Sequence, residues 1–324
     1  MGAWQDKLGE TWQAWRERWL LADHGAWLTT AVAVVLVAML ALGWYWSREP
    51  GSLVLPAAGQ PGEVLAQTLV DVAATLRDKP GGYLHNDMLP PGLLLDDMPS
   101  WELGVLRQVR DLARALHRDM GLSHADFAAD ADLAAAEAAF NVKPGSWLFP
   151  RAEAELADGE AALRRYRQRL AQLKARFYTR PAYLQRWLAD VDGALGMSTG
   201  RLNAALMPLP SAVEGSTGGL AERTPWYRID NVFYEARGEA WALLQLLRAV
   251  EVEYADELDR RQVRLSLRAA IHELEATQQA LWSPVVLNGS GFGLFANHSL
   301  VMANYLARAR ADLADVAVAL REGE

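Results

Sequence analysis

The longest apolar stretch of the sequence lies near its start. Residues 28–46 read LTTAVAVVLVAMLALGWYW and contain no charged side chain. A helix of this length, with a rise of about 1.5 Å per residue, spans roughly 28 Å and matches a hydrocarbon core of about 30 Å. Aromatic rings stand at both edges, as in helices that cross a bilayer: Trp27, Trp44, Tyr45 and Trp46. The pattern predicts a transmembrane helix over residues 27–46.

A second apolar pattern precedes this stretch. Five large side chains recur at spacings of four and three, which places them on one face of a helix: Trp4, Leu8, Trp12, Trp15 and Trp19. Because tryptophan favours the membrane interface, we interpret residues 1–26 as a cytoplasmic amphipathic segment that lies on the bilayer. Packing of the same stripe against a partner helix is the alternative.

The basic residues predict an orientation for the apolar helix. Lys7, Arg16 and Arg18 precede it, and only Arg48 follows it closely. Lys and Arg are enriched on the cytoplasmic side of a span, so we expect a cytoplasmic N-terminus and a main domain outside the cytoplasm. A cleaved signal peptide is the alternative, but the leader is long and no small-residue cleavage pattern directly follows the apolar run.

The rest of the sequence has the periodicity of helices. Residues 47–62 are rich in Pro and Gly and predict a flexible tether. Beyond the tether, apolar positions recur every three or four residues. The expected helices cover residues 64–76, 101–120, 130–140, 152–177, 181–206, 230–258, 263–282 and 298–320.

These patterns predict an all-α fold, with an N-terminal transmembrane helix followed by a helical bundle of about seven or eight helices over residues 63–324. No alternation of apolar and polar residues is long enough for a sheet. Glycines could break the helix over residues 181–206 near 193–200, and the Pro/Gly/Ser/Thr-rich stretch 207–225 could divide the helical domain in two.

Composition and charge narrow the chemistry. The 324 residues carry a formal net charge of −8 with no long basic run, which argues against a nucleic-acid partner. There is no cysteine, so disulfides and thiolate metal sites are excluded. His272 and Glu275 stand three residues apart on one expected helix, but the further ligands of known His/Glu motifs are missing. We therefore expect no metal and no cofactor.

Two glutamates are the candidates for acid/base chemistry. Glu235 stands beside Phe233 and Tyr234, and Glu102 follows Trp101 near the start of an expected helix. A pair of carboxylates across a cleft could hydrolyse a glycan, which makes an envelope hydrolase one alternative function. Ion pairing, or interaction with a helix dipole, is the more common role of carboxylates on helices.

A glycine-rich loop precedes the last expected helix. Residues 285–300 read VVLNGSGFGLFANHSL. This loop lacks the spacing, the lysine and the preceding strand of a phosphate-binding loop. We interpret it as a tight connection between two helices, with Asn297 as the N-cap of the second.

Four segments rich in aromatic residues and glycine connect the expected helices, at residues 81–92, 141–150, 225–234 and 285–297. We expect them to gather at one or both ends of the bundle. Loops on a rigid scaffold often carry binding sites, so Tyr83, Trp226 and Phe292 are the candidate binding residues.

Several longer blocks resemble a family of Gram-negative bacterial membrane proteins known as domain of unknown function 2333. The blocks are GGYLHNDMLPPG, SWELGVLRQVRDLARAL, FYTRPAYLQRWLADVDGALG, PWYRIDNVFYEARGEAWALL and LEATQQALWSPVVLNGSGFGLFANHSLVMANYLARA. The resemblance implies a single-pass inner-membrane protein. It implies no substrate, cofactor or site residue.

The sequence thus favours a non-enzymatic envelope protein, anchored through residues 27–46, that presents a helical periplasmic domain to an envelope protein or a cell-wall partner. The glycan hydrolase is the first alternative. The second is a lipid-binding protein, which would need an apolar cavity open at one end.

Overall fold

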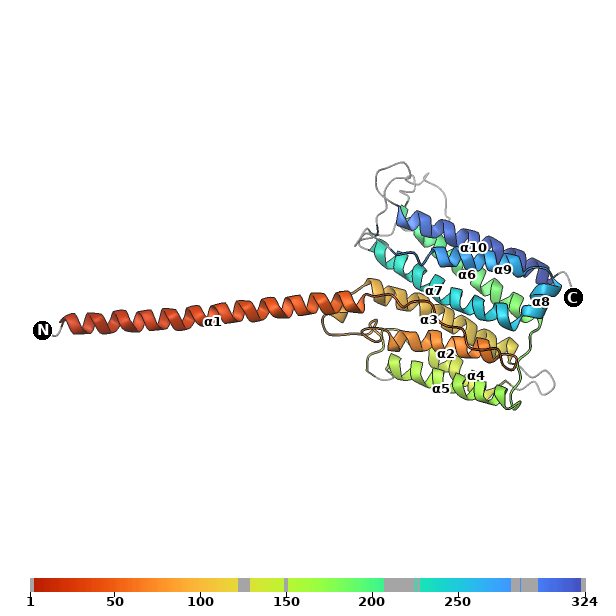
Figure 1. Cartoon of the computed structure of the whole chain (residues 1–324), viewed down its shortest axis with the longest axis horizontal. Helices are drawn as coiled ribbons and strands as arrows, with labels where there is room; N and C mark the ends of the chain where they lie inside the picture. The colour runs from red at the N-terminus through yellow and green to blue at the C-terminus, as the bar shows by residue number, and fades with distance from the viewer. Residues whose placement is uncertain are drawn as a thin grey trace, which may run out of the picture.

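The computed structural model describes residues 3–121, 129–148, 151–206, 225, 228–280, 286 and 297–321, and within these ranges the protein is all-α without a strand. Its first helix, α1 (Ala3–Trp46), is continuous and projects from a bundle of shorter helices (Figure 1). The stretch Gly25–Trp46 of α1 has 22 residues with a mean hydropathy of 2.2, and Gly43, near its end, is its one buried residue. At a rise of about 1.5 Å per residue it is about 33 Å long, enough to cross a membrane.

The bundle contains nine further α-helices within the described ranges. They are α2 (Glu63–Asp78), α3 (Asp97–Ala115), α4 (Ala131–Phe140), α5 (Ala152–Ala171), α6 (Pro181–Leu206), α7 (Ile229–Glu253), α8 (Ala255–Arg260), α9 (Arg264–Ala276) and α10 (His298–Arg321). A short 3-10 turn, η1 (Gly92–Leu94), precedes α3, and a π-helical turn, η2 (Leu116–Met120), follows it.

The helices differ from the expected ones at breaks and at ends, since those expected over residues 152–177 and 263–282 end at Ala171 and Ala276. The helix expected over residues 230–258 is divided into α7 and α8, because the backbone leaves the helical region at Tyr254. In contrast, α6 continues through Gly193 and Gly200, where its packing along α10 offsets the weak helix propensity of glycine. Asn297 caps α10 as expected, since its Oδ1 accepts the N–H of Leu300 at 2.9 Å.

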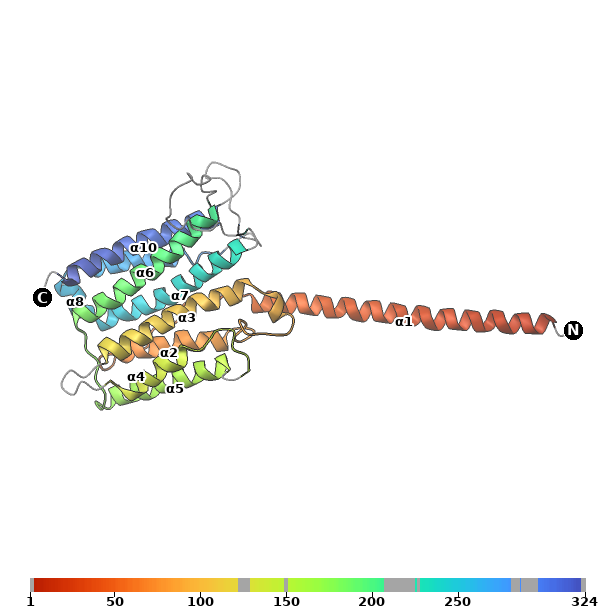
Figure 2. The same cartoon turned by 180° about the vertical axis from the view of Figure 1, so that it is seen from behind.

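The helices α3 and α7 form the central pair of the bundle. They contact each other more extensively than any other two helices do. One group of helices, α2, α4 and α5, lies on one side of this pair, and α6, α9 and α10 lie on the other (Figures 1 and 2). Buried residues from both groups belong to one hydrophobic core, so the helices before and after the stretch 207–225 pack as one bundle.

Two glycines allow α3 and α7 to approach each other closely. A Cβ on Gly104 of α3 would overlap the carbonyl oxygen of Glu235, and a Cβ on Gly238 of α7 would overlap the carbonyl oxygen of Trp101. The rings of Trp101 and Trp241 pack beside this contact, with centroids 5.1 Å apart. Any side chain at either glycine would therefore force the two central helices apart.

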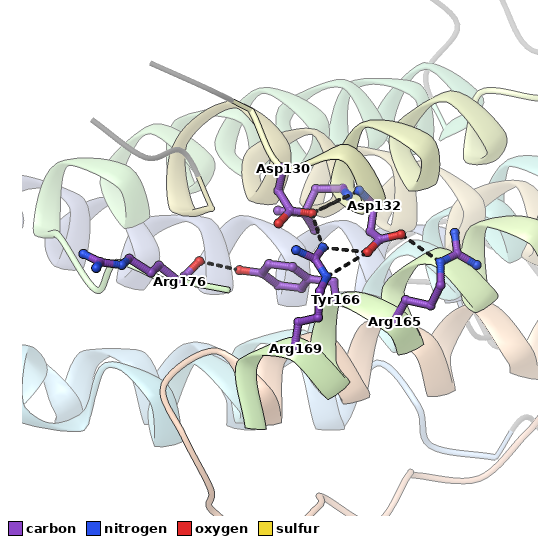
Figure 3. A network of polar contacts seen from close by, with 7 residues as sticks. Asp130, Asp132, Arg165, Tyr166, Arg169 and Arg176 are labelled. Atoms are coloured by element: carbon purple, nitrogen blue, oxygen red, sulfur yellow. Dashed lines mark hydrogen bonds and ion pairs between the residues drawn. The ribbon is translucent and has the colours of Figure 1, made fainter. Parts of the chain in front are cut away.

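A polar network fastens α4 to α5 on the edge of the bundle (Figure 3). Asp130 caps α4 by accepting the N–H of Asp132 at 3.0 Å, and it also pairs with Arg169 at 2.6 Å. Asp132 pairs with both Arg165 and Arg169 of α5. The hydroxyl group of Tyr166 donates to the carbonyl of Arg176 at 2.8 Å, which holds the segment after α5. These charges are paired with one another, so the network is a structural tie between helices.

The segment between α1 and α2 lies along α7 and is called the strap here (residues 47–62). Trp241 donates through Nε1 to the carbonyl of Gly51 at 3.1 Å, and the side-chain oxygen of Gln245 accepts the N–H of Leu53 at 3.1 Å. Glu253, at the end of α7, accepts the N–H groups of Gly62 and Val64. The segment expected to be a flexible tether is therefore held at both ends and in the middle.

The α3–α7 contact generates a prediction for stability. The substitutions Gly104→Ala and Gly238→Ala should each lower the free energy of unfolding by about 1–3 kcal/mol, because the new methyl group meets a backbone carbonyl that cannot move away. Urea unfolding of the detergent-solubilised protein measures the effect. The control is Gly193→Ala, at an exposed helical position with no atom within 4 Å of the added Cβ. It should be neutral or stabilise by up to about 1 kcal/mol. Equal effects at all three glycines would contradict the close contact.

Candidate functional site

The end of α1 contacts the loop between α2 and α3, and this junction is the candidate functional site. A Cβ on Gly43 would lie 3.7 Å from both Pro91 and Leu95, so the loop between α2 and α3 touches the last turns of α1. The Trp46 ring lies against Gly81, where an added Cβ would come within 2.7 Å of Trp46 Cγ. Gly81 also has a φ of 85°, which favours glycine. The other aromatic residues expected at the membrane edge, Trp27, Trp44 and Tyr45, are exposed.

A buried ion pair shapes the loop that receives α1. The carboxylate of Glu102 lies 2.7 Å from Lys79 Nζ, and both side chains are completely buried. The same carboxylate accepts the N–H of Leu84 at 2.9 Å and that of His85 at 2.8 Å. Lys79 in turn donates to the carbonyl of Gly82 at 2.7 Å. Glu102 and Lys79 thus replace water as the partners of a turn that the core encloses.

Burial sets the electrostatics of Glu102. Desolvation raises its pKa to about 7, against the opposing effects of Lys79 and of the N–H groups of Leu84 and His85. With this pKa, the carboxyl group suits proton exchange near neutral pH. It is closed off from solvent, however, so it cannot meet a substrate in this conformation.

Tyr83, one of the candidate binding residues, lies in the same loop. Its ring is 3% exposed and belongs to the hydrophobic core, so it faces inward and not toward a partner. Its hydroxyl group is buried without a hydrogen-bond partner among the described residues. Trp226 and Phe292, the other two candidates, lie outside the described residues.

Arg237 connects the junction to the centre of the bundle. This side chain of α7 is 4% exposed and pairs with Glu49 of the strap at 2.8 Å. Its remaining donors reach the carbonyls of Thr277 at 2.8 Å and Gln279 at 3.0 Å, at the end of α9. Helix ends leave such carbonyls without partners, so one guanidinium group satisfies α9 and holds the chain where it leaves α1.

A groove runs beside the strap on the outer face of α7. One hollow of about 400 Å³ is lined by strap residues together with Arg237, Trp241, Arg248 and Gln278. A second hollow of about 560 Å³ adjoins it at Arg248 and is lined mainly by apolar groups, which include Leu53, Leu55 and Val252. Charged side chains line both hollows, with Arg237 and Glu275 in the first and Glu251 and Arg264 in the second.

Glu235, the other candidate acid, belongs to a second polar cluster, between α3, α6 and α7. It pairs with Arg201 at 2.7 Å and also with Arg107. Arg107 reaches a second carboxylate, the fully buried Glu239, at 3.3 Å. Glu239 also accepts hydrogen bonds from Ser198 and from Gln108.

The two carboxylates of this cluster have opposite pKa shifts. Burial disfavours the charge on Glu235, but the hydrogen bond from Arg201 and the charges of Arg201 and Arg107 outweigh it and lower the pKa. Burial dominates at Glu239 and raises its pKa. Opposed shifts in a neighbouring pair are typical of acid/base sites, but neither Glu235 nor Glu102 lines the two hollows beside the strap. Their contacts are those of ion pairs that join helices.

Among the described residues, no group of three His, Asp or Glu side chains could hold a metal ion. His272 is highly exposed on α9, and its nearest carboxylate oxygen, from Glu275, is 3.7 Å away.

Sequence reasoning missed Lys79, Arg237, Glu239 and Glu49, which do most of the connecting. A signal for two of them is present in the segment EARGEA, where Arg237 and Glu239 directly precede the apolar stretch AWALLQLL. A charge beside such a stretch must be paired or exposed, but the sequence does not say with which partner.

Acidic residues also gather near the junction, and Asp97 generates a prediction for pH. Burial and the nearby charges of Asp96, Asp230 and Glu49 raise its pKa to about 7. The unfolded chain has a value near 3.9, so the folded state holds a proton between about pH 4 and pH 7 that the unfolded state has lost. Asp97 therefore lowers stability as the pH rises through this window.

The variant Asp97→Asn should remove this part of the pH dependence. Its thermal midpoint relative to the unmodified protein should rise from pH 5 to pH 7 and level off above about pH 8, because asparagine has no proton to lose. Thermal unfolding at several pH values measures the difference. Asp158→Asn, at an exposed position on α5, is the control and should leave the slope unchanged. A constant offset for Asp97→Asn at all pH values would contradict the assignment.

No curated protein and no solved structure matches the chain. Residues 21–323 match the profile of a family described as uncharacterized proteins conserved in bacteria, DUF2333. This range includes the apolar stretch of α1, the strap and every helix of the bundle. The chain belongs to this family.

Proposed function

We propose that the protein is anchored in the bacterial inner membrane by α1 and that its bundle acts in the periplasm as a binding or scaffold component of the cell envelope. The length, hydropathy and exposure of residues Gly25–Trp46 carry the proposal. These residues are uncharged, long enough to cross a bilayer and, apart from Gly43 near the bundle, not buried. A helix from the core of a soluble protein would bury one face.

The basic residues before the span support the orientation. Lys7, Arg16 and Arg18 belong to the N-terminal half of α1, before the span and far from the bundle. Arg48 follows the span and stacks on the ring of Trp44, 4.2 Å from its centroid. The larger number of Lys and Arg residues before the span than just after it favours a cytoplasmic N-terminus, which leaves the bundle in the periplasm.

The binding role is supported by the groove beside the strap. Both walls are fixed, because Trp241 and Gln245 hold the strap and Arg237 holds the end of α9. A preformed groove orders few side chains on binding, which lowers the entropic cost of association. Its apolar surface with charged side chains along it suits an extended segment of a partner protein that carries both apolar and charged residues.

A single experiment tests both parts of the proposal. The chain has no cysteine, so Val252→Cys in the groove, Val318→Cys on α10 and Gln5→Cys before the span are each unique labelling sites. The probe is a membrane-impermeant maleimide that carries a photoreactive benzophenone, added to cells with a permeabilised outer membrane. We expect labelling at Val252→Cys and Val318→Cys in intact cells, and at Gln5→Cys only after lysis.

Illumination then tests the groove. Val252→Cys should give a crosslinked species of higher mass, whereas the matched exposed position Val318→Cys should not. Labelling of Gln5→Cys alone would reverse the proposed orientation. Identical crosslinks from both valine positions, or none from either, would remove the support for binding in the groove.

A further inference from the structure

The loop that receives α1 exposes several large apolar side chains. Between α2 and α3, Met88 and Leu93 are each 57% exposed, Leu94 is 70% exposed and Leu89 is 76% exposed. Scattered apolar residues are normal on protein surfaces, but four within seven residues form a patch that calls for an explanation.

The backbone of this loop leaves few donors in need of water. Positions 90 and 91 are prolines and have no N–H group. The N–H groups of Leu93, Leu94 and Leu95 donate to carbonyls within the loop, at 3.1, 2.9 and 3.0 Å. An apolar environment strongly disfavours unpaired backbone groups, and most N–H groups of this loop are hydrogen-bonded within it.

The position of the loop identifies what covers the patch. Pro91 and Leu95 lie against Gly43, which is three residues before the end of the apolar stretch at Trp46. At about 1.5 Å per residue, Gly43 lies about 4.5 Å inside that end. Both views show this loop beside the last turns of α1 (Figures 1 and 2). If residues 25–46 span a bilayer, the loop therefore reaches the depth of its outer margin.

A neighbouring loop adds to the patch. Trp147 and Leu148, between α4 and α5, are also more than half exposed. Their loop is fixed to the first one, because Asn86 Nδ2 donates to the carbonyl of Ser146 at 3.0 Å. Tryptophan and leucine at one level beside a membrane helix are typical of segments that sit in the interface.

We propose that Leu89, Leu93 and Leu94, together with Trp147, insert into the outer margin of the bilayer that α1 spans, so that the bundle rests on the membrane. This inference depends on the proposed anchor. Asp87 and Asp96 flank the leucines, so burial of apolar surface drives the insertion, without attraction to anionic headgroups. The bundle would then be attached to the membrane through α1 and through these two loops.

Spin labels on single cysteines test the insertion in the full-length protein, reconstituted in phosphatidylcholine nanodiscs. Leu93→Cys reports on the loop and Leu36→Cys on the centre of the span. Leu265→Cys, at the start of α9 and 78% exposed, is the matched exposed leucine at the opposite end of the bundle. Relaxation by oxygen, which partitions into lipid, is compared with relaxation by a water-soluble nickel chelate.

We expect oxygen to dominate at Leu36→Cys and Leu93→Cys, and the nickel chelate to dominate at Leu265→Cys. Nickel accessibility at Leu93→Cys equal to that at Leu265→Cys, while Leu36→Cys remains in lipid, would overturn the insertion and leave the anchor intact. Shielding of Leu93→Cys from both reagents would mean that a second copy of the chain covers the patch, and would also overturn it. Nickel accessibility at Leu36→Cys would overturn the anchor, and the insertion with it.

Discussion

The close contact of α3 and α7 at Gly104 and Gly238 is the constraint on which the other features depend. Without side chains at these positions, the two helices meet backbone to backbone and form the centre of the bundle. Helices packed this closely bring their neighbouring side chains into a dry interior, where each polar group must find a partner. Most of the buried ion pairs and hydrogen bonds described above supply these partners.

The residues on either side of Gly238 show how the requirement is met. Glu239 points into the bundle and is balanced by Arg107, Gln108 and Ser198 from two other helices. Arg237 points the other way, where it satisfies the end of α9 and pairs with Glu49 of the strap. A tripeptide in α7 thus joins the core of the bundle to the segment that leaves α1. Because buried charges are costly to leave unpaired, this connection favours one arrangement of the strap.

The sequence predicted the elements of this fold better than their connections. The apolar stretch of α1 and the helices of the bundle follow from composition and periodicity, because each depends on residues close together in the chain. The pairing of Arg237 with Glu49 joins residues separated by 188 positions, and no local pattern specifies it. The same applies to Glu102, expected near a helix start and found enclosed with Lys79. Tyr83 lies in a loop rich in glycine and aromatic residues, as in many binding sites, but the turn that Glu102 holds directs the Tyr83 ring into the core.

The strap, the Arg237–Glu49 pair and the contacts of Trp46 hold the end of α1 in one position on the bundle. The distance between spin labels at Leu36→Cys on α1 and Leu265→Cys on α9 tests this claim most directly, by pulsed electron resonance on the full-length protein in nanodiscs. A rigid junction predicts a single narrow distance distribution, which should broaden in the variant Arg237→Ala. A broad distribution in the protein with Arg237 intact would contradict the claim, because it would mean that the bundle swings freely about the end of α1.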